Sequence, residues 1–364
     1  MAHGGRVYEY AAASGMDVAN IVDFSANINP LGPPAGVLKA IETAMPRIVH
    51  YPDARHQAVK EILAQACQVD VSALFCGNGA TEVIELVFRA VRPRRTFVLD
   101  PAFSEYADIA QRMGSQIERV SLKRTQITWD LPLDELDARL EVGDLVVINT
   151  PHNPTSTVWP WDTFRTCALN WCERGVTVVI DESFIDFLLQ SSSLSAIADA
   201  CMYPRLFVIR SATKIYAIPG LRFGFGIGHR DFVRGIEANR DGWSVNALAQ
   251  AAACAAYCDG QFLEETHTWL ASEHDYLQQT WGADERLVWH VPKVNFFIAS
   301  FATPHVREHV QDALRQRGIL SRSCDDFHGL DSTYVRFAIR SHQDNQLLWT
   351  AVVAALDAIP CESL

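Results

Sequence analysis

The sequence has few basic residues relative to acidic ones. Lys and Arg together number 31 against 43 Asp and Glu, which gives a formal net charge of −12. A polyanion would be repelled by this overall charge, because phosphate-backbone binding depends on clustered Lys and Arg. We therefore expect no nucleic-acid partner.

Long apolar runs and metal-binding cysteine pairs are also missing. No run approaches the roughly 18–20 residues that cross a bilayer, and the first residues lack the apolar stretch of a signal peptide. Nine cysteines are scattered, and the closest pair, Cys254 and Cys258, has no histidine nearby. We expect buried reduced thiols, no metal site, no membrane partner and a cytoplasmic location.

The length and composition indicate a folded globular protein. The 364 residues suggest two domains, at roughly 100–200 residues per domain. Between about Val71 and Gly228, short β-branched segments alternate with amphipathic helical ones, which predicts an α/β fold with a mostly parallel sheet. The clearest predicted strands are 96–99, 145–149, 176–180, 206–210 and 223–227.

The C-terminal part has a different pattern. Residues 246–281 are helical in pattern, and strands at 294–300, 319–322 and 334–339 then alternate with helices at 304–316 and 343–358. An N-terminal extended stretch precedes a helix that begins near Ala35, after Pro30–Pro34. We predict a large domain at 46–270 and a small α+β domain formed by 1–45 and 271–364.

Two motifs carry side chains suited to covalent and electrostatic chemistry. Lys214 lies in the segment 211–222, which leaves a predicted strand and enters a loop. A lysine in a partly desolvated cleft can lose its proton and bond to an aldehyde. Asp181 ends an apolar strand, at the edge where an open α/β sheet presents ligand groups.

Two further motifs supply neutral donors. In Gly77-Asn78-Gly79-Ala80-Thr81, glycines precede a helix, so backbone N–H groups and the helix dipole can hold a phosphate. Asn153 follows a strand and can offer its amide to a ligand. Alone, each motif has an ordinary explanation: a plain turn, a strand-end cap or a surface lysine. Their order favours a cofactor site: phosphate turn, Asn loop, Asp181, then Lys214 with an arginine downstream.

In this order the motifs resemble the fold type I enzymes that use pyridoxal 5′-phosphate (PLP), the class I/II aminotransferase superfamily, over nearly the whole chain. The resemblance implies that Lys214 holds the cofactor covalently. It also implies that Asp181 pairs with the protonated pyridine nitrogen and that Asn153 hydrogen-bonds the phenolic oxygen. The fold it implies is the PLP-dependent transferase fold, with a large domain and a smaller α+β domain.

The same resemblance assigns the other cofactor contacts. Phe103 would stack on the ring, and Tyr51 would reach the phosphate of the neighbouring subunit's cofactor, which implies a homodimer. The residues implied for the phosphate are Gly79, Ala80, Thr81, Ser211 and Arg222.

Within the superfamily, the segments 23–34, 181–187 and 213–222 are similar to the threonine-phosphate decarboxylases of cobalamin biosynthesis. Histidinol-phosphate aminotransferases usually have tyrosine where this chain has Phe184, and the decarboxylases are expected to lack it. A second departure, Ser156 in place of the glycine of an Asn-Pro-Thr-Gly motif, is expected to change only the turn.

The decarboxylase resemblance implies a phosphorylated amino acid as the small-molecule substrate. Arg336 would bind the substrate carboxylate as a bidentate pair. Arg322 and His3 would lie near the substrate phosphate, and Asn27, in the first of the similar segments, is also predicted to bind substrate.

Three alternatives remain open. The first is an aminotransferase acting on a phosphorylated amino acid such as histidinol phosphate, because the two activities share their cofactor contacts. They differ in which Cα bond lies perpendicular to the cofactor ring. The second is serine phosphate in place of threonine phosphate as substrate. The third is a ligand sensor without catalysis, which the presence of Lys214 and Asp181 disfavours.

Overall fold

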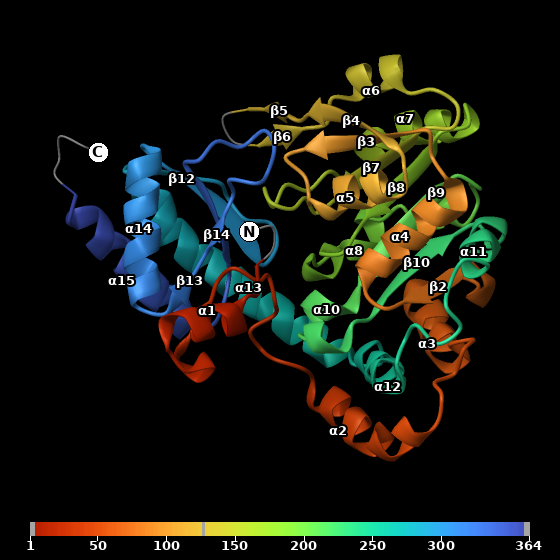
Figure 1. The fold of residues 1–364 in the computed structure, drawn as a ribbon, viewed down its shortest axis with the longest axis horizontal. Helices are drawn as coiled ribbons and strands as arrows, with labels where there is room; N and C mark the ends of the chain where they lie inside the picture. The colour runs from red at the N-terminus through yellow and green to blue at the C-terminus, as the bar shows by residue number, and fades with distance from the viewer. Residues whose placement is uncertain (1–3, 126–127, 360–364) are drawn as a thin grey trace.

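The computed structural model describes residues 4–125 and 128–359 and contains two main sheets (Figure 1). The larger sheet has seven strands in the order β2-β10-β9-β8-β7-β3-β4. β10 runs antiparallel to both of its neighbours, and the other pairs are parallel. The prediction of a mostly parallel α/β sheet is therefore confirmed. The strands are β2 (Leu74–Gly77), β3 (Arg95–Asp100), β4 (Gln116–Ser121), β7 (Leu145–Asn149), β8 (Thr177–Asp181), β9 (Leu206–Ser211) and β10 (Gly224–Gly228).

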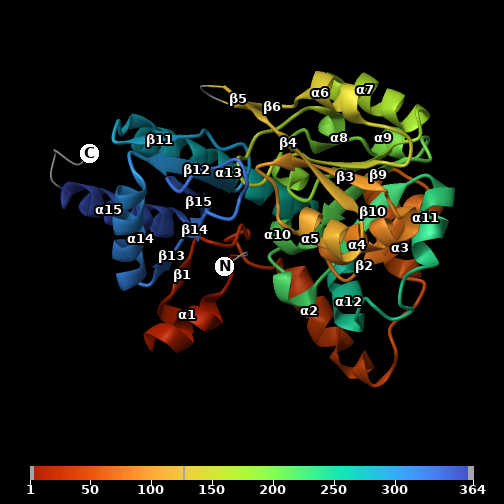
Figure 2. The same ribbon diagram turned by 45° about the horizontal axis from the view of Figure 1, so that its top comes forward.

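Both faces of this sheet are buried. In β7, Leu145 and Val147 belong to one hydrophobic cluster, and Val146 and Ile148 belong to another. Successive side chains of a strand point to opposite faces, so an uninterrupted apolar strand needs helices on both sides. One face is covered by α4 (Ala80–Val91), α5 (Glu105–Arg112) and α11 (Arg230–Glu237), and the other by α3 (Gln57–Cys67), α7 (Trp161–Glu173) and α12 (Ala247–Ala256) (Figure 2).

The second main sheet is antiparallel, in the order β11-β12-β15-β14. Its strands are β11 (Leu287–Trp289), β12 (Phe296–Phe301), β14 (Arg322–Ser323) and β15 (Tyr334–Ala338), and it packs with α14 (Pro304–Gln316) and α15 (His342–Asp357). Thr303 caps α14 by accepting a hydrogen bond from Val306 N, and Ser341 caps α15 in the same way. These caps explain why both helices begin close to where the sequence predicts.

One predicted strand is wrong in detail. The predicted strand 319–322 is two short strands in different sheets, because β13 (Ile319–Leu320) pairs with β1 (Val22–Asp23) while β14 pairs with β15. The helical pattern predicted over 246–281 is confirmed, as two helices, α12 and α13 (Gly260–Thr280), the second of which is capped by Asp259. Local periodicity does not reveal which strand is the partner, since pairing depends on distant residues.

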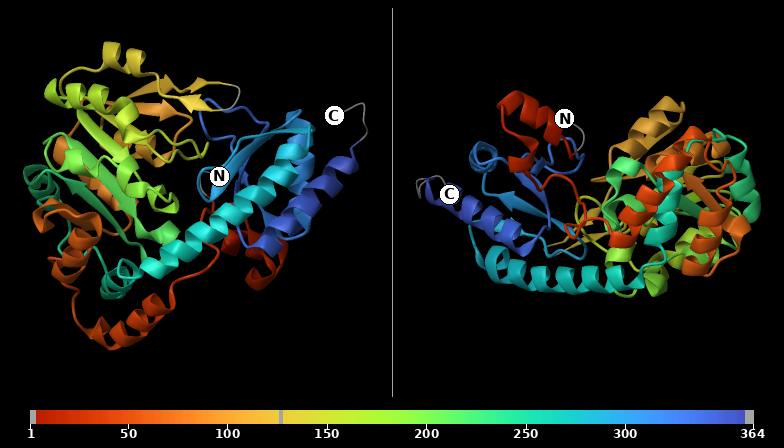
Figure 3. Two further views of the ribbon diagram at one scale, coloured as in Figure 1. Left: turned by 180° about the vertical axis from the view of Figure 1, so that it is seen from behind. Right: turned by 90° about the horizontal axis from the view of Figure 1, so that it is seen from below.

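The N-terminal segment and α13 connect the two sheets. β1 pairs with β13 beside the small sheet, whereas α2 (Ala35–Ala44) packs against α12. α13 runs from the side of the large sheet to the small one (Figure 3), and the predicted boundary at residue 270 falls within it. The division into 46–270 and the two flanking parts stays a prediction. The remaining helices and strands are α1 (Val7–Ser14), β5 (Lys123–Arg124), β6 (Trp129–Asp130), α6 (Leu133–Arg139), α8 (Ser191–Leu194), α9 (Ile197–Ala200) and α10 (Ala212–Ile215).

Across the described residues, every helix is too short or too polar to cross a bilayer.

Candidate active site

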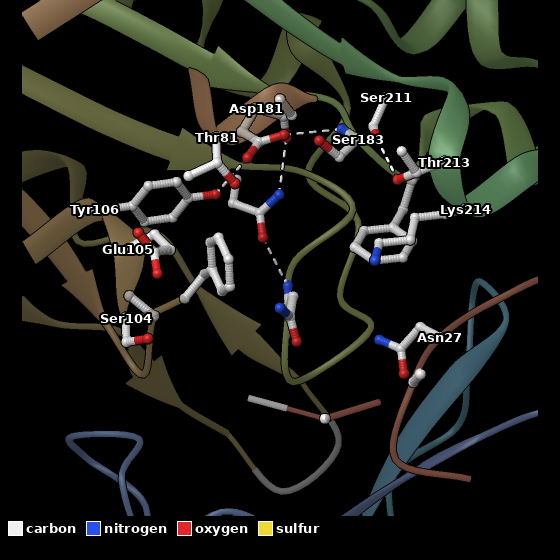
Figure 4. A pocket seen from close by; sticks show the side chains of 18 of the residues that line it. Asn27, Thr81, Ser104, Glu105, Tyr106, Asp181, Ser183, Ser211, Thr213 and Lys214 are labelled. Atoms are coloured by element: carbon white, nitrogen blue, oxygen red, sulfur yellow. Dashed lines mark hydrogen bonds between the residues drawn. The ribbon is translucent and has the colours of Figure 1, made fainter. Parts of the chain in front are cut away.

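A cavity of about 340 Å³ lies at the carboxyl ends of β7 and β8, between the two sheets and the N-terminal segment (Figure 4). This is the edge at which α/β sheets bind ligands. The structure brings most of the predicted site residues together in its wall: Asn27, Ala80, Thr81, Phe103, Asn153, Asp181, Ser211, Lys214, Arg222, Arg322 and Arg336.

Lys214 lies in the wall because α10 follows β9 immediately, so one short helical turn directs its amine into the cavity. Desolvation, with a smaller contribution from the positive charges of Arg222 and Arg336, lowers the pKa of Lys214 to about 8. A substantial share of this amine is therefore neutral near pH 8, the form that attacks a carbonyl.

Asp181 is the last residue of β8 and is buried. Its carboxylate accepts a hydrogen bond of 2.6 Å from the Tyr106 hydroxyl and one of 2.9 Å from Ser183 N. Burial raises the pKa of Asp181, and these two hydrogen bonds oppose that rise. Both partners are neutral, so neither balances the negative charge. The carboxylate is suited to a cationic ligand group such as a protonated ring nitrogen.

The glycine turn before α4 forms a cradle with Arg222. Gly79 is the N-cap of α4 and has a φ of 84°, and a Cβ added to it would lie 2.4 Å from Arg222 Nη2. A Cβ on Gly224 would lie 2.4 Å from Ala80 N, so a second glycine lets β10 approach this turn. Backbone N–H groups at a helix start, with a guanidinium beside them, fit a phosphate.

Hydroxyl groups complete the cradle. Ser211 and Thr213, which flank the start of α10, share a hydrogen bond of 2.8 Å between their oxygens. Both residues line the cavity, as does Thr81 from the first turn of α4. Gly79 itself is not among the lining residues and contributes through the backbone turn.

Asn153 is oriented by its neighbours. Its backbone N donates to Asn149 Oδ1 at 2.8 Å, and its own Oδ1 accepts from Arg336 Nη1 at 2.6 Å. Because Arg336 occupies the oxygen end of the amide, the Nδ2 end is the one that a ligand oxygen can use. Phe103 lies nearby in the wall, with its ring edge-on to that of Tyr106 at a centroid distance of 5.6 Å.

The small sheet supplies two arginines. Arg322 in β14 and Arg336 in β15 are directly opposite each other in the antiparallel register. Like charges directly opposite each other in a sheet are destabilising, so this pair needs nearby anions or acceptors. Burial and the charge of Arg322 lower the pKa of Arg336 to about 10.

Protein acceptors hold parts of both guanidinium groups. Arg336 Nη2 donates to the Ser25 carbonyl at 2.7 Å, while its Nε has no hydrogen-bond partner among residues 4–125 and 128–359. Arg322 donates to Asp326 and to the Ser323 carbonyl. Asn27 Oδ1 is likewise buried without a partner in the described chain. Unsatisfied buried polar atoms in a cavity wall are suited to a bound polar ligand.

Besides Gly79, two further predicted residues are not placed in this cavity. Tyr51 is 79% exposed and stacks on Trp243 with a centroid distance of 4.6 Å, so one chain does not bring it to its own site. Its predicted contact with the partner subunit's cofactor stays a prediction. His3 lies outside the described residues.

Four further lining residues, Tyr106, Ser183, Asn149 and Asp326, were not predicted from the sequence. Tyr106 carried a signal, because it lies three residues after Phe103 and therefore on the same side of a short helical turn. Asp326 carried none, because it lies in the loop between β14 and β15. Phe184, the residue that departs from the aminotransferase pattern, lines the cavity and packs edge-on against Phe296 at 4.9 Å.

Comparison with known proteins identifies the family. The model of aminotransferase class I and II matches residues 19–352. The chain belongs to this family. Class I and II aminotransferases depend on PLP, and the buried carboxylate, the amine and the phosphate cradle described above fit that cofactor.

Individual members of the family are similar over almost their full length. The chain is 34% identical to threonine-phosphate decarboxylase of Salmonella typhimurium, covering 98% of this chain and 97% of that protein. It is 31% identical to histidinol-phosphate aminotransferase of Symbiobacterium thermophilum, and the match covers 93% of this chain and 91% of that protein. The crystal structure of histidinol-phosphate aminotransferase from Clostridium acetobutylicum is similar with a TM-score of 0.86 at 27% identity. The match covers 93% of this chain and 100% of that one.

Proposed function

We propose that this enzyme decarboxylates L-threonine O-3-phosphate to (R)-1-aminopropan-2-yl phosphate, with PLP as cofactor. The observation that carries the proposal is the pair Arg322 and Arg336, which are opposite each other in one sheet and line the same cavity as Lys214. Two adjacent cations suit a substrate that carries both a carboxylate and a phosphate. The similarity to a threonine-phosphate decarboxylase supports the same substrate.

The cofactor side of the cavity has a role for each predicted residue. Bound PLP supplies an electron sink for the pair left behind when a bond to Cα breaks. Asp181 would keep the ring nitrogen protonated, and Asn153 Nδ2 would donate to the phenolic oxygen. Phe103 would pack on the ring. Lys214 would be the covalent anchor, and the cofactor phosphate would be held at Gly79, Ala80, Thr81, Ser211 and Arg222.

On the substrate side, Arg336 would hold the carboxylate and thereby orient the bonds of Cα. Arg322, with His3, would hold the phosphate end, and Asn27 would be a further substrate-binding residue. When the bond from Cα to the carboxylate breaks, carbon dioxide leaves and Cα needs a proton. The Lys214 amine, with a pKa of about 8, can carry that proton at neutral pH.

The second candidate is transamination of a phosphorylated amino acid such as histidinol phosphate. It is favoured by the relatives named for that activity. Both reactions use the same cofactor contacts, and a small change in the position of the substrate clamp separates them. Phe184 favours decarboxylation, because the resemblance associates a tyrosine at this position with the aminotransferases.

We further propose a cytoplasmic homodimer that serves cobalamin biosynthesis. Large apolar side chains are exposed along α2 and the turn after it, and Trp243 lies beside this region; the exposed side chains are Leu38, Met45, Ile48, Val49, Tyr51 and Trp243. Several large apolar side chains exposed in neighbouring segments are typical of a protein interface. A second subunit covering it would bring Tyr51 towards the neighbouring cofactor. Light scattering tests this, since a monomer at working concentration would contradict it.

A product assay tests the proposed reaction. The enzyme is supplied with L-threonine O-phosphate, L-serine O-phosphate or histidinol phosphate, each with and without 2-oxoglutarate. We expect carbon dioxide release from threonine phosphate that does not depend on the keto acid. Stoichiometric transfer of the amino group to 2-oxoglutarate with the carboxylate retained would instead identify an aminotransferase. A bound cofactor without any turnover would support the sensor alternative.

A further inference from the structure

Asp326 occupies the guanidinium group that the proposed substrate phosphate needs. Arg322 Nη2 donates to Asp326 Oδ1 at 2.8 Å and to Oδ2 at 2.7 Å, so both of its N–H groups point at one carboxylate. Arg322 Nη1 donates to the Ser323 carbonyl at 2.7 Å. Asp326 itself lines the cavity. A phosphate can therefore gain the Nη2 hydrogen bonds only when Asp326 releases them.

The two partners differ in how firmly they are held. The Arg322 side chain is 8% exposed, lies in β14, and has its guanidinium 5.2 Å from the centre of the Phe327 ring. The Asp326 side chain is 30% exposed and belongs to the turn that follows β14. The arginine is thus fixed by the sheet, whereas the carboxylate can turn towards water without exposing apolar surface.

We propose that Asp326 is a specificity-determining residue that acts as a displaceable counter-ion: it pairs with Arg322 in the empty site and gives way to a phosphate monoester. This inference rests on the proposed function, because it takes the substrate phosphate to bind at Arg322. Arg336 lies directly opposite Arg322 in the sheet, so an unpaired Arg322 would place two positive charges side by side. Asp326 reduces that repulsion until the ligand arrives.

The exchange distinguishes ligands by their charge. A ligand with a neutral side chain offers Arg322 no anion in place of Asp326, so the ion pair between Arg322 and Asp326 stays formed. A phosphate monoester carries close to two negative charges at pH 7 and three acceptor oxygens, so it competes successfully with a single carboxylate. After the reaction, Asp326 can return to Arg322 as the phosphorylated product leaves. Asp326 therefore weakens phosphate binding in exchange for a neutralised empty site.

The test uses Asp326→Asn in the PLP-loaded enzyme, with isopropyl phosphate as a probe that has a phosphate but no amino or carboxyl group. Asparagine keeps the size of the side chain and removes its charge. We expect the Kd for isopropyl phosphate, measured by calorimetry, to fall about threefold to fivefold, the factor expected for removing a partly exposed ion pair. The KM for threonine phosphate should fall by a similar factor, and binding of free threonine should not change.

Asp325→Asn is the matched control. Asp325 is the preceding residue, and its carboxylate accepts hydrogen bonds from Ser323 Oγ and Arg307 Nη2. It is not among the residues that line the cavity. It should leave the Kd for isopropyl phosphate unchanged. If Asp326→Asn does not fold, Asp326→Ser removes the same charge with a shorter side chain.

Opposite results overturn the inference. A Kd that rises or stays the same in Asp326→Asn means that the carboxylate positions Arg322 and does not compete with the ligand. An equal effect of Asp325→Asn means that only the general charge of the loop matters. Failure of the proposed function is distinguishable, because a wild-type enzyme that does not decarboxylate threonine phosphate can still bind isopropyl phosphate more weakly than Asp326→Asn does.

Discussion

The two sides of the cavity differ in how their charged groups are satisfied. On the side of the seven-stranded sheet, the Asp181 carboxylate is held by the neutral donors Tyr106 and Ser183, which leave its charge to a ligand. On the side of the small sheet, Arg322 and Arg336 already donate to protein acceptors, Asp326 among them. The first side is arranged in advance for one permanent group, whereas the second must exchange protein acceptors for those of a substrate.

The cofactor side therefore carries the chemistry common to the family, and the substrate side determines which substrate binds. The cofactor side comes from strand ends and helix starts, where the backbone fixes each side chain. The substrate side comes from the short edge strand β14, its neighbour β15, a loop and the N-terminal segment, where a small displacement changes the geometry. Variants on the first side should therefore affect all substrates alike, and variants on the second should discriminate among them.

The largest effect is expected from Lys214→Ala, which removes the covalent anchor on the cofactor side. Turnover should fall by about 10⁴-fold or more, as when other enzymes lose a covalent nucleophile, and for every substrate alike. The absorption band of the lysine-bound cofactor should disappear as well. A variant that keeps this band would show that a different lysine is the anchor.

Asp181→Asn should give the next largest effect, because it removes a charge without changing the size of the side chain. We expect the cofactor to remain bound and kcat to fall about 10²- to 10³-fold, as when one preorganised electrostatic group is lost from a buried site. Absorption spectra measure occupancy, and the product assay measures the rate. Near wild-type turnover would contradict the role of this carboxylate.

The cofactor side and the substrate side also differ in how well the sequence predicts them. The cofactor side was predictable from the order of motifs along the chain, since Asp181 ends an apolar strand, Lys214 follows another and Gly79 precedes a helix. The structure brings the predicted residues of this side into one cavity, apart from Tyr51 and Gly79, and Gly79 contributes through its backbone turn. Tyr106 was missed, because its contact with Asp181 spans 75 residues of sequence.

The substrate side was less predictable. Arg322 and Arg336 were proposed from resemblance. The local pattern predicts 319–322 as one strand, so it does not reveal the register in which these two arginines are opposite each other. Asp326 lies in a loop, where no periodic pattern indicates the direction of a side chain. Contacts that depend on tertiary pairing are the ones that local patterns cannot supply.

Arg322→Ala tests the substrate side directly. Loss of a charge-assisted hydrogen bond to phosphate costs about 1.5–3 kcal/mol, so binding of threonine phosphate should weaken by about 10- to 150-fold. Binding of free threonine should change little, as measured by inhibition constants. Arg317→Ala, at the end of α14 and away from the cavity, is the control. Equal losses for both ligands would contradict a phosphate site at Arg322.

The smallest effect is expected from Tyr106→Phe, which removes one neutral donor from Asp181 and keeps the ring. The carboxylate retains Ser183 N and the cofactor nitrogen, so kcat should fall by only about threefold to tenfold. The Tyr106 hydrogen bond lowers the pKa of Asp181, so its loss should raise that pKa and favour the protonated acid. Activity should then decline at a higher pH on the acidic side of the profile.

A control and a pH profile distinguish this positioning role from a purely structural one. Tyr10→Phe removes a hydroxyl that donates to the Arg315 carbonyl, away from the cavity, and should leave the profile unchanged. If Tyr106→Phe lowers only the melting temperature while the acidic limb keeps its midpoint, Tyr106 merely fills space. A shifted limb with every substrate alike would mean that Tyr106 acts through Asp181, as expected for the side of the cavity that all substrates share.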